Sequence, residues 1–253
     1  MEYKIYRTLG FVLGEETFQE NDKIFFCFTK DFGKIELLAK GIRKIKAKLK
    51  MAMQLFSQVK IEFIRGKNFY ILTDACLIKD YSNIKKSFRR AKKMSLFCFL
   101  LLCFLGGEEK DENLWKLLEE IFEDFEKESL EKEELVFLYF ILNLTSLFGF
   151  CPQIQECVLC QKKIKDFLFP HFYFSLKEGG LVCEKCKKKV DDAFEISVHL
   201  LKLLKLIFSR NKKVFLKVKV NDKVLKELRR FSQKFLEKTL ETKLHLNFES
   251  VFL

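Results

Sequence analysis

The sequence predicts an α+β multidomain protein in which a small closed β-barrel precedes an α-helical part that carries a cysteine-rich module. Short apolar and β-branched runs fill the first 80 positions, helical periodicity dominates from about Tyr81, and two Cys-x-x-Cys pairs lie between residues 157 and 186. The expected domains are a barrel at 1–80, a first helical part at 81–155, the cysteine module at 156–190 and a second helical part at 191–253.

The first domain contains five predicted strands. In the fourth, apolar residues alternate with charged ones from Val59 to Phe63, which is the period of a half-buried strand. Five short strands in about 75 residues suit a five-stranded OB-fold barrel. The longest gap, Gly41 to Leu55, follows the third strand, where such barrels often carry a helix or a long loop. The predicted strands are Tyr6–Leu13, Lys23–Thr29, Lys34–Lys40, Ser57–Arg65 and Phe69–Ile78.

Predicted helices fill most of the remaining chain. Ser82–Leu105 is basic at its start and apolar at its end, and Gly106-Gly107 supplies its stop. Its apolar run, Met94–Leu105, is only 12 residues long, too short to span a bilayer, so we expect a buried helix and no membrane partner. The other predicted helices are Asn113–Phe125, Glu134–Phe148, Val198–Phe208 and Lys223–Leu240, with a short strand or extended connector at Val214–Val220.

The cysteine module carries the strongest chemical signal. Two Cys-x-x-Cys turns can place four thiolates at the corners of a tetrahedron, the geometry of a closed zinc site. Two disulfides or a redox dithiol are the alternatives. No segment resembling a signal peptide is present, so we expect a reducing cytoplasm, where structural disulfides are rare, and a redox motif occurs singly. The prediction is one structural Zn²⁺ held by Cys157, Cys160, Cys183 and Cys186.

The five other cysteines lie outside these pairs. Cys27, Cys76, Cys98 and Cys103 have apolar neighbours and are expected to be small buried hydrophobes. Cys151 is close to the module, and it is either a packing residue or a spare ligand. His171, between the two pairs, is a weaker candidate for a substitute ligand.

Charge is unevenly distributed along the chain. Thirteen acidic and four basic residues lie between Glu108 and Glu134, so this segment carries −9 and leaves +21 on the remainder of a chain whose net charge is +12. A large positive surface is typical of a protein that binds a polyanion, with a membrane surface as the competing partner. An AT-rich genome would explain part of the lysine content and the thirty phenylalanines.

Three basic segments are candidates for nucleic-acid contacts, and the third consists of Lys185 and Lys187–Lys189 around the last cysteine of the module. The segment from Lys40 to Lys50 has six basic residues and no acid, and it falls in the long loop of the barrel. Phe26, Phe28 and Phe32 are candidate stacking residues, although core packing explains them as well. The predicted DNA-binding residues are Lys34, Lys40, Arg43, Lys44, Lys46, Lys48 and Lys50. A secondary basic patch, or simply a solvated helix end, comprises Lys85, Lys86, Arg89, Arg90, Lys92 and Lys93.

No catalytic constellation is present in the sequence. The histidines at 171, 199 and 245 have no nucleophile close in sequence, and no Walker loop or GxGxxG motif occurs. The acids of 108–134 fit solvated helical faces better than a metal-dependent nuclease site. We therefore expect a binding protein and not an enzyme.

Several of these segments occur together, and in the same order, in one protein family. The chain resembles the RecO family of bacterial recombination mediators over most of its length. The segments that carry the resemblance are Gly10–Leu13, Glu20–Lys23, Phe28–Lys34, Ala39–Lys44, Phe69–Ala75, Phe148–Pro152, Cys157–Cys160, Phe174-Ser175 and Gly179–Cys186.

The resemblance implies an OB-fold, a helical domain and a zinc module. It also implies binding of single- and double-stranded DNA, annealing of complementary strands, and, together with RecR, help in loading RecA onto DNA covered by single-strand DNA-binding protein (SSB). The family's basic loop matches Lys40, Arg43 and Lys44. Ala47-Lys48-Leu49 departs from the Ser-Arg-Leu that the family often has there. The implied location is the bacterial cytoplasm, in association with the nucleoid.

The resemblance also suggests docking on the acidic C-terminal tail of SSB, for which an apolar pocket bordered by cations is required. The candidates on one predicted helix are Phe97, Leu101 and Phe104, preceded by Arg89, Arg90 and Lys93. Core packing of the three apolar residues is the alternative. For the whole chain the alternative function is a zinc-ribbon RNA-binding protein of ribosome assembly or translation, and a DNA enzyme is a third, less favoured hypothesis.

Overall fold

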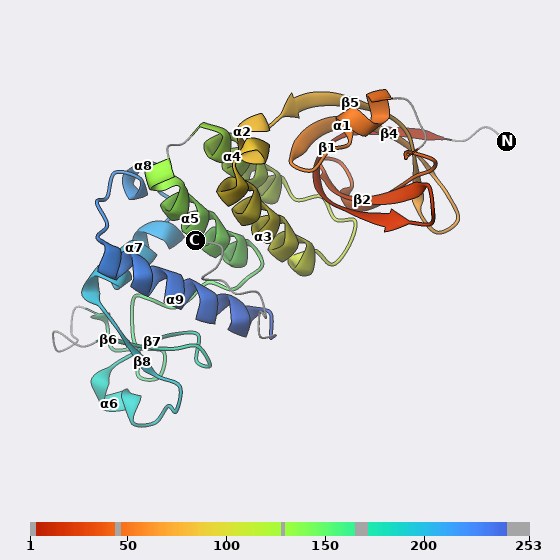
Figure 1. Cartoon of the computed structure of the whole chain (residues 1–253). Helices are drawn as coiled ribbons and strands as arrows, with labels where there is room; N and C mark the ends of the chain where they lie inside the picture. The colour runs from red at the N-terminus through yellow and green to blue at the C-terminus, as the bar shows by residue number, and fades with distance from the viewer. Residues whose placement is uncertain (1–3, 44–46, 128–129, 165–171, 242–253) are drawn as a thin grey trace. The chain divides into compact units, whose positions relative to one another are not determined.

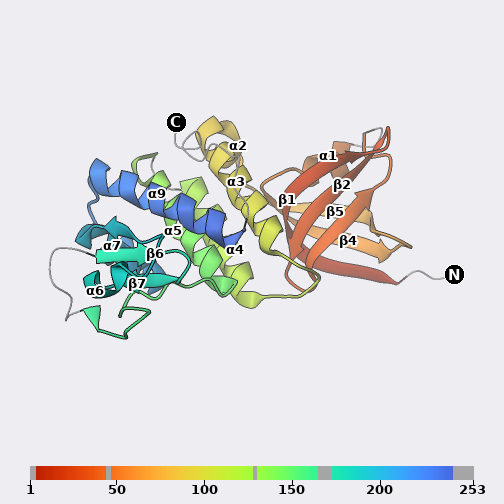
Figure 2. The same ribbon diagram turned by 90° about the horizontal axis from the view of Figure 1, so that it is seen from below.

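The computed structural model of the protein describes residues 4–43, 47–127, 130–164 and 172–241, with only the backbone described for residues 47, 48 and 130–132. The chain divides into two compact units, Met1–Ser129 and Leu130–Leu253, which are drawn as ribbons in Figure 1 and Figure 2. The predicted domain boundaries after residues 80, 155 and 190 stay predictions.

The first unit begins with the predicted closed barrel. Its strands lie in the order β1-β2-β3-β5-β4, and β1 closes the ring by pairing with β4. All neighbours are antiparallel except β3 and β5, which pair in parallel through Leu37 with Tyr70 and Leu38 with Ile71. This is the expected OB-fold barrel, with a short helix in the long gap. The elements are β1 (Ile5–Phe18), β2 (Asp22–Thr29), β3 (Gly33–Ala39), α1 (Ala47–Ala52), β4 (Ser57–Arg65) and β5 (Tyr70–Asp80).

The barrel interior is filled by the alternate apolar residues of its strands. Val59, Ile61 and Phe63 of β4 are fully buried there, as their spacing predicts. Cys27 lies in the same core, and its burial raises the pKa of the thiol above its ordinary value. The prediction of burial is wrong for Cys76, which lies on β5 and is exposed.

A second apolar cluster joins the barrel to the helices of the first unit. Phe11 of β1 contacts Trp115 and Phe122 of α4, with ring centroids 5.0 and 4.8 Å apart, and Tyr81 contacts Phe122 at 5.0 Å. Large aromatic rings buried in this way contribute strongly to stability. The helices of the unit are α2 (Ser82–Lys86), α3 (Phe88–Phe104) and α4 (Glu112–Lys127).

The single helix predicted for Ser82–Leu105 is wrong in one respect, because it breaks at Ser87. Ser87 has an extended backbone, and its hydroxyl accepts a hydrogen bond from the backbone N–H of Arg90, so this residue caps α3. The apolar run then forms a helix with one solvated side. Phe99 is 48% exposed and Cys103 is also exposed, which corrects the prediction that Cys103 is buried.

The second unit is built on three packed helices, α5 (Leu130–Leu147), α7 (Val198–Phe208) and α9 (Asp222–Thr239). The strand or extended connector predicted for Val214–Val220 is wrong at its start, where the helical turn α8 (Lys212–Phe215) lies, whereas residues 218–220 belong to neither a helix nor a strand. The side chain of Asn211 accepts a hydrogen bond from the N–H of Val214 and so begins that turn. Within the described residues, no helix combines the length and the apolar character needed to cross a membrane.

Candidate metal centre and nucleic-acid interface

The four predicted ligand cysteines meet in one cluster in the second unit. The sulfur atoms of Cys157, Cys160, Cys183 and Cys186 all lie within 4.8 Å of one another. The Sγ atoms of Cys160 and Cys183 are 3.7 Å apart. Four sulfur atoms bound to Zn²⁺ at about 2.3 Å would be separated by about 3.8 Å along each edge of the tetrahedron. The spacing is far longer than the roughly 2 Å of a disulfide, and every one of these cysteines is a free thiol.

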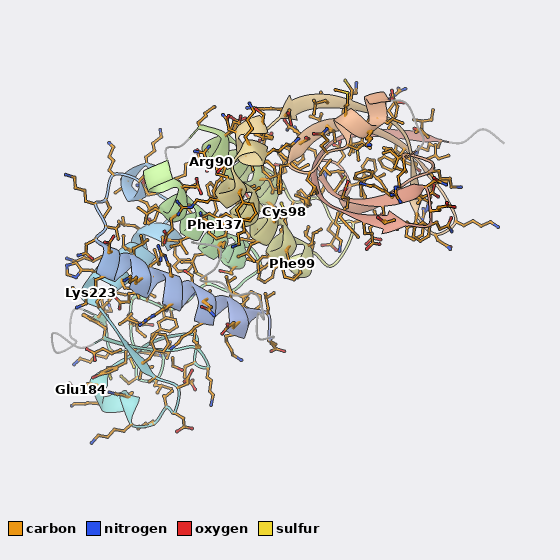
Figure 3. All side chains as sticks on the ribbon, viewed as in Figure 1. Arg90, Cys98, Phe99, Phe137, Glu184 and Lys223 are labelled. Atoms are coloured by element: carbon orange, nitrogen blue, oxygen red, sulfur yellow. The ribbon has the colours of Figure 1, made fainter. Side chains whose placement is uncertain are left out.

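A small sheet brings the two cysteine pairs together. Strands β6 (Phe172–Ser175), β7 (Gly180–Val182) and β8 (Phe194–Ile196) lie in the order β7-β6-β8, and α6 (Glu184–Lys187) follows β7 directly. Figure 3 labels Glu184 at the start of α6, between the two cysteines of the second pair.

Close backbone contact then holds the first pair against β7. The N–H of Gln153 donates to the carbonyl of Gly179, and the carbonyl of Gln153 accepts from the N–H of Leu181. Gly180 is required because a Cβ atom there would lie only 2.5 Å from the carbonyl oxygen of Gln153 and 2.6 Å from Val158. The Gly-Gly before the second pair therefore takes part in assembling the site.

The electrostatics of the cluster favour a bound cation. Burial raises the pKa of Cys157, but hydrogen bonds from the backbone N–H groups of Cys183, Cys160 and Leu159 outweigh that effect and lower the pKa to about 7. Burial and the neighbouring thiols raise the pKa of Cys186 to about 12. One thiolate thus forms readily, whereas further negative charge is resisted unless a metal ion neutralises it. The residues present fit a metal ion with four sulfur ligands.

The two additional ligand candidates do not extend the cluster. Cys151 is exposed and does not belong to the group of described side chains that could hold a metal. His171 lies outside the described residues. The four-thiolate set therefore remains the candidate centre.

The basic loop of the barrel is only partly described. Lys40, Arg43 and Lys50 are exposed, and Lys34 is half-buried on β3. Lys44 and Lys46 lie outside the described residues, and for Lys48 only the backbone is described. The guanidinium of Arg43 donates to the carbonyl of Glu20 at 3.0 Å, which fixes the loop to the turn between β1 and β2 without neutralising the charge.

A hollow of about 440 Å³ in the first unit brings basic residues from three segments together. Arg43 and Lys50 of the loop line it with Lys23 of β2 and Lys85 of α2. Lys23 is a residue that sequence reasoning missed. The register of the barrel could have indicated it, because Lys23 pairs with Ala39 at the end of β3 and so stands beside the start of the basic loop. Glu15 offsets one of these charges by pairing with Lys23 at 2.5 Å.

The residues of the secondary basic patch differ in their surroundings: some make contacts within the first unit, and others face outward. Lys85 forms an ion pair with Asp80 and donates to Ser57 at 2.9 Å, so it ties α2 to the barrel. Arg90, labelled in Figure 3, donates to the carbonyl of Phe125 at 2.7 Å near the end of α4, and Lys93 is 2% exposed. Lys86 and Arg89 are exposed, Lys85, Arg90 and Lys92 are half-buried, and only Lys93 of the six is buried.

Burial also limits the aromatic and apolar residues that are candidates for contacts with DNA bases or an SSB tail. Phe32 packs edge-on against Phe63 at 5.4 Å and so against the barrel core, Phe28 is fully buried, and Phe26 is half-buried. Phe97 and Leu101 are also fully buried. These two residues therefore pack in the core, as the alternative predicted, whereas Phe104 is half-buried. Docking of an SSB tail on this helix stays a prediction.

Comparison with known proteins gives matches along nearly the whole chain. Residues 1–81 match the family model described as Recombination protein O N terminal, and residues 88–247 match the one described as Recombination protein O C terminal. Curated relatives named DNA repair protein RecO include that of Caldicellulosiruptor bescii, 28% identical over 94% of each chain. That of Caldanaerobacter subterraneus subsp. tengcongensis is 28% identical over 96% of this chain and 95% of its own. That of Dehalococcoides mccartyi is 28% identical over 88% of this chain and 86% of its own.

Proposed function

The chain belongs to the RecO family of DNA repair proteins, and from that premise we propose that it is a non-catalytic mediator that binds and anneals DNA strands. In this proposal it also helps to load RecA onto single-stranded DNA covered by SSB, together with RecR. It would act in the bacterial cytoplasm in association with the nucleoid. The observation that carries the proposal is the OB-fold hollow at which the basic loop meets cations from β2 and α2.

The barrel supports DNA binding through its charge. Arg43 and Lys50 keep uncompensated positive charge at the rim of the hollow, because their described contacts involve no carboxylate. Each cation that neutralises a phosphate releases condensed counterions, which provides affinity that does not depend on sequence. Sequence-independent binding is what annealing of arbitrary complementary strands requires, since the strands themselves supply the specificity.

The cysteine centre supports a structural role for one Zn²⁺. Four thiolates leave no position for a water molecule, so a bound zinc ion would stabilise the fold of the second unit and would not activate a substrate. The proposed ligands are Cys157, Cys160, Cys183 and Cys186. The bound ion would hold the first pair against β7 and α6.

Annealing of complementary oligonucleotides coated with SSB tests the proposal. The purified protein, without ATP, is expected to accelerate duplex formation, as followed by energy transfer between dyes on the two strands. A variant with Arg43 and Lys50 changed to Gln should lose most of this acceleration. A control variant with Lys202 and Lys226 changed to Gln, on the second unit, removes the same charge and should retain it. Wild-type protein that leaves the annealing rate unchanged would contradict the proposal.

A further inference from the structure

A second hollow of the first unit, outside the basic loop, has the composition of an anion site. Its volume is about 320 Å³, and it lies where the turn between β4 and β5 meets the start of β3 and the loop between α3 and α4. Lys34, Arg65 and Lys67 line it. Among the residues that the structure describes, none of these three cations has a carboxylate partner in an ion pair.

Aromatic side chains form another part of the wall. Tyr70 and Phe69 line the hollow and are half-buried. Phe69 contacts Phe18 at 5.6 Å, and Tyr70 packs edge-on against Phe63 at 4.9 Å, so both rings are held in place by the barrel. Fixed, partly accessible rings beside cations suit an unpaired base together with its phosphate.

An acidic side chain from the chain itself reaches into this hollow. The hydroxyl of Tyr70 donates to the carboxylate of Glu108 at 2.8 Å. Burial and then this hydrogen bond raise the pKa of Tyr70, so the phenol keeps the proton that it donates. A phosphodiester of a nucleic acid resembles this carboxylate in two respects. Its oxygen atoms also accept a hydrogen bond, and it also carries a single negative charge.

The loop that carries Glu108 is anchored on one side and free on the other. The backbone of Glu109 lies against Gly33, where a Cβ atom would be only 2.2 Å from the carbonyl oxygen of Glu109. At Gly106 and Gly107, in contrast, an added Cβ atom would meet no atom of a residue beyond its chain neighbours within 4 Å, and both glycines are exposed, so there is open space beside the chain before Glu108. Rotation about this glycine pair can move the carboxylate without disturbing the barrel.

We propose that Glu108 occupies the place of a nucleic-acid phosphate in this hollow, and that a single strand binds there by displacing it. The proposal rests on the proposed function, because it names a further contact of the same DNA-binding barrel. With Glu108 in place the hollow holds three cations against two carboxylates, Glu36 and Glu108. Binding of a phosphodiester exchanges one anion for another, so the strap formed by residues 106–109 weakens binding without abolishing it.

The test is a cycle of charge-neutral substitutions in the full-length protein. Affinity for a labelled oligothymidylate is measured by fluorescence anisotropy for wild type, Glu108→Gln, the pair Arg65→Gln and Lys67→Gln, and all three together. We expect Glu108→Gln to tighten binding about 2- to 5-fold at low salt, which is the effect of one partly screened charge pair. In the background that lacks Arg65 and Lys67 the same change should have little effect, because the competition has been removed.

Control measurements separate this proposal from the proposed function. Glu178→Gln removes the same charge from an exposed position in the second unit and should change affinity less than Glu108→Gln. Glu108→Ala, a second variant at an exposed position, should also tighten binding. Equal effects of Glu108→Gln and Glu178→Gln, or weaker binding by both Glu108 variants, would overturn the strap while leaving DNA binding intact. Absence of oligothymidylate binding by wild type would instead overturn the proposed function.

Discussion

Replacement of Gly180 by alanine is expected to separate the two halves of the cysteine centre. The added methyl group would lie 2.5 Å from the carbonyl oxygen of Gln153, 2.6 Å from Cγ1 of Val158 and 2.9 Å from Cβ of Gln153. None of these distances is tolerated between real atoms, and the closest one involves backbone, which cannot rotate away. The segment that carries Cys157 must therefore move away from β7.

The loss of stability follows from the hydrogen bonds that this movement would break. Three backbone hydrogen bonds link the two segments: from the N–H of Gln153 to Gly179 at 2.9 Å, from the N–H of Leu181 to Gln153 at 2.8 Å, and from the N–H of Val158 to Leu181 at 2.9 Å. At about 1 kcal/mol for each bond, the free energy of unfolding should fall by about 2–3 kcal/mol. If the same distortion is expressed as weaker metal binding, the zinc dissociation constant should rise roughly 30- to 150-fold.

Gly179→Ala provides the matched control for this prediction. Gly179 has a φ of +72°, and no atom lies within 4 Å of its Cβ position, so alanine there costs about 1 kcal/mol of backbone strain without displacing a neighbour. Urea unfolding followed by circular dichroism, and competition for zinc with a chromogenic chelator, measure the two effects. Indistinguishable stability and zinc affinity in the two variants would refute the reasoning from close backbone contact.

Three further predictions concern the metal, the barrel loop and the half-buried carboxylate of Asp192. Purified protein should contain one equivalent of zinc, and Cys160→Ser should lower this content and loosen the second unit; metal-free reduced protein that unfolds at the same temperature would contradict this. Changing Arg43 and Lys50 to Gln should weaken DNA binding equally for different sequences. It should also flatten the slope of log K against log salt by about 0.7 for each lost contact with a single strand. An unchanged slope would place the DNA contacts elsewhere. Burial tends to raise the pKa of Asp192, but hydrogen bonds from the Ser175 hydroxyl and from backbone N–H groups outweigh it and lower the pKa. Since the folded pKa is depressed, the stabilisation is present above the unfolded value of about 3.9 and is lost as the pH falls below it. Urea midpoints of wild type should therefore drop more steeply than those of Asp192→Asn in that acid range.

Local patterns in the sequence were sufficient for much of this protein. The alternation from Val59 to Phe63 identifies a strand with one buried face, and the two Cys-x-x-Cys turns identify four cysteines that could hold a metal ion, because each signal depends only on residues a few positions apart. The helix predicted for Val198–Phe208 is observed with the same bounds. Such local patterns can be recognised in a sequence without knowing which residues pack against them.

The tertiary structure alone decided which charged and aromatic side chains remain available. Sequence assigns Lys85, Arg90 and Lys93 to one basic patch, but Lys85 is paired with Asp80, Arg90 bonds to Phe125, and Lys93 is buried. A periodic pattern indicates which side of a helix is apolar or charged, whereas the element that covers each side is set by contacts distant in sequence. Glu108 meets Tyr70 for the same reason, since the two residues are 38 positions apart in sequence and only the packing of a loop on the barrel brings them together.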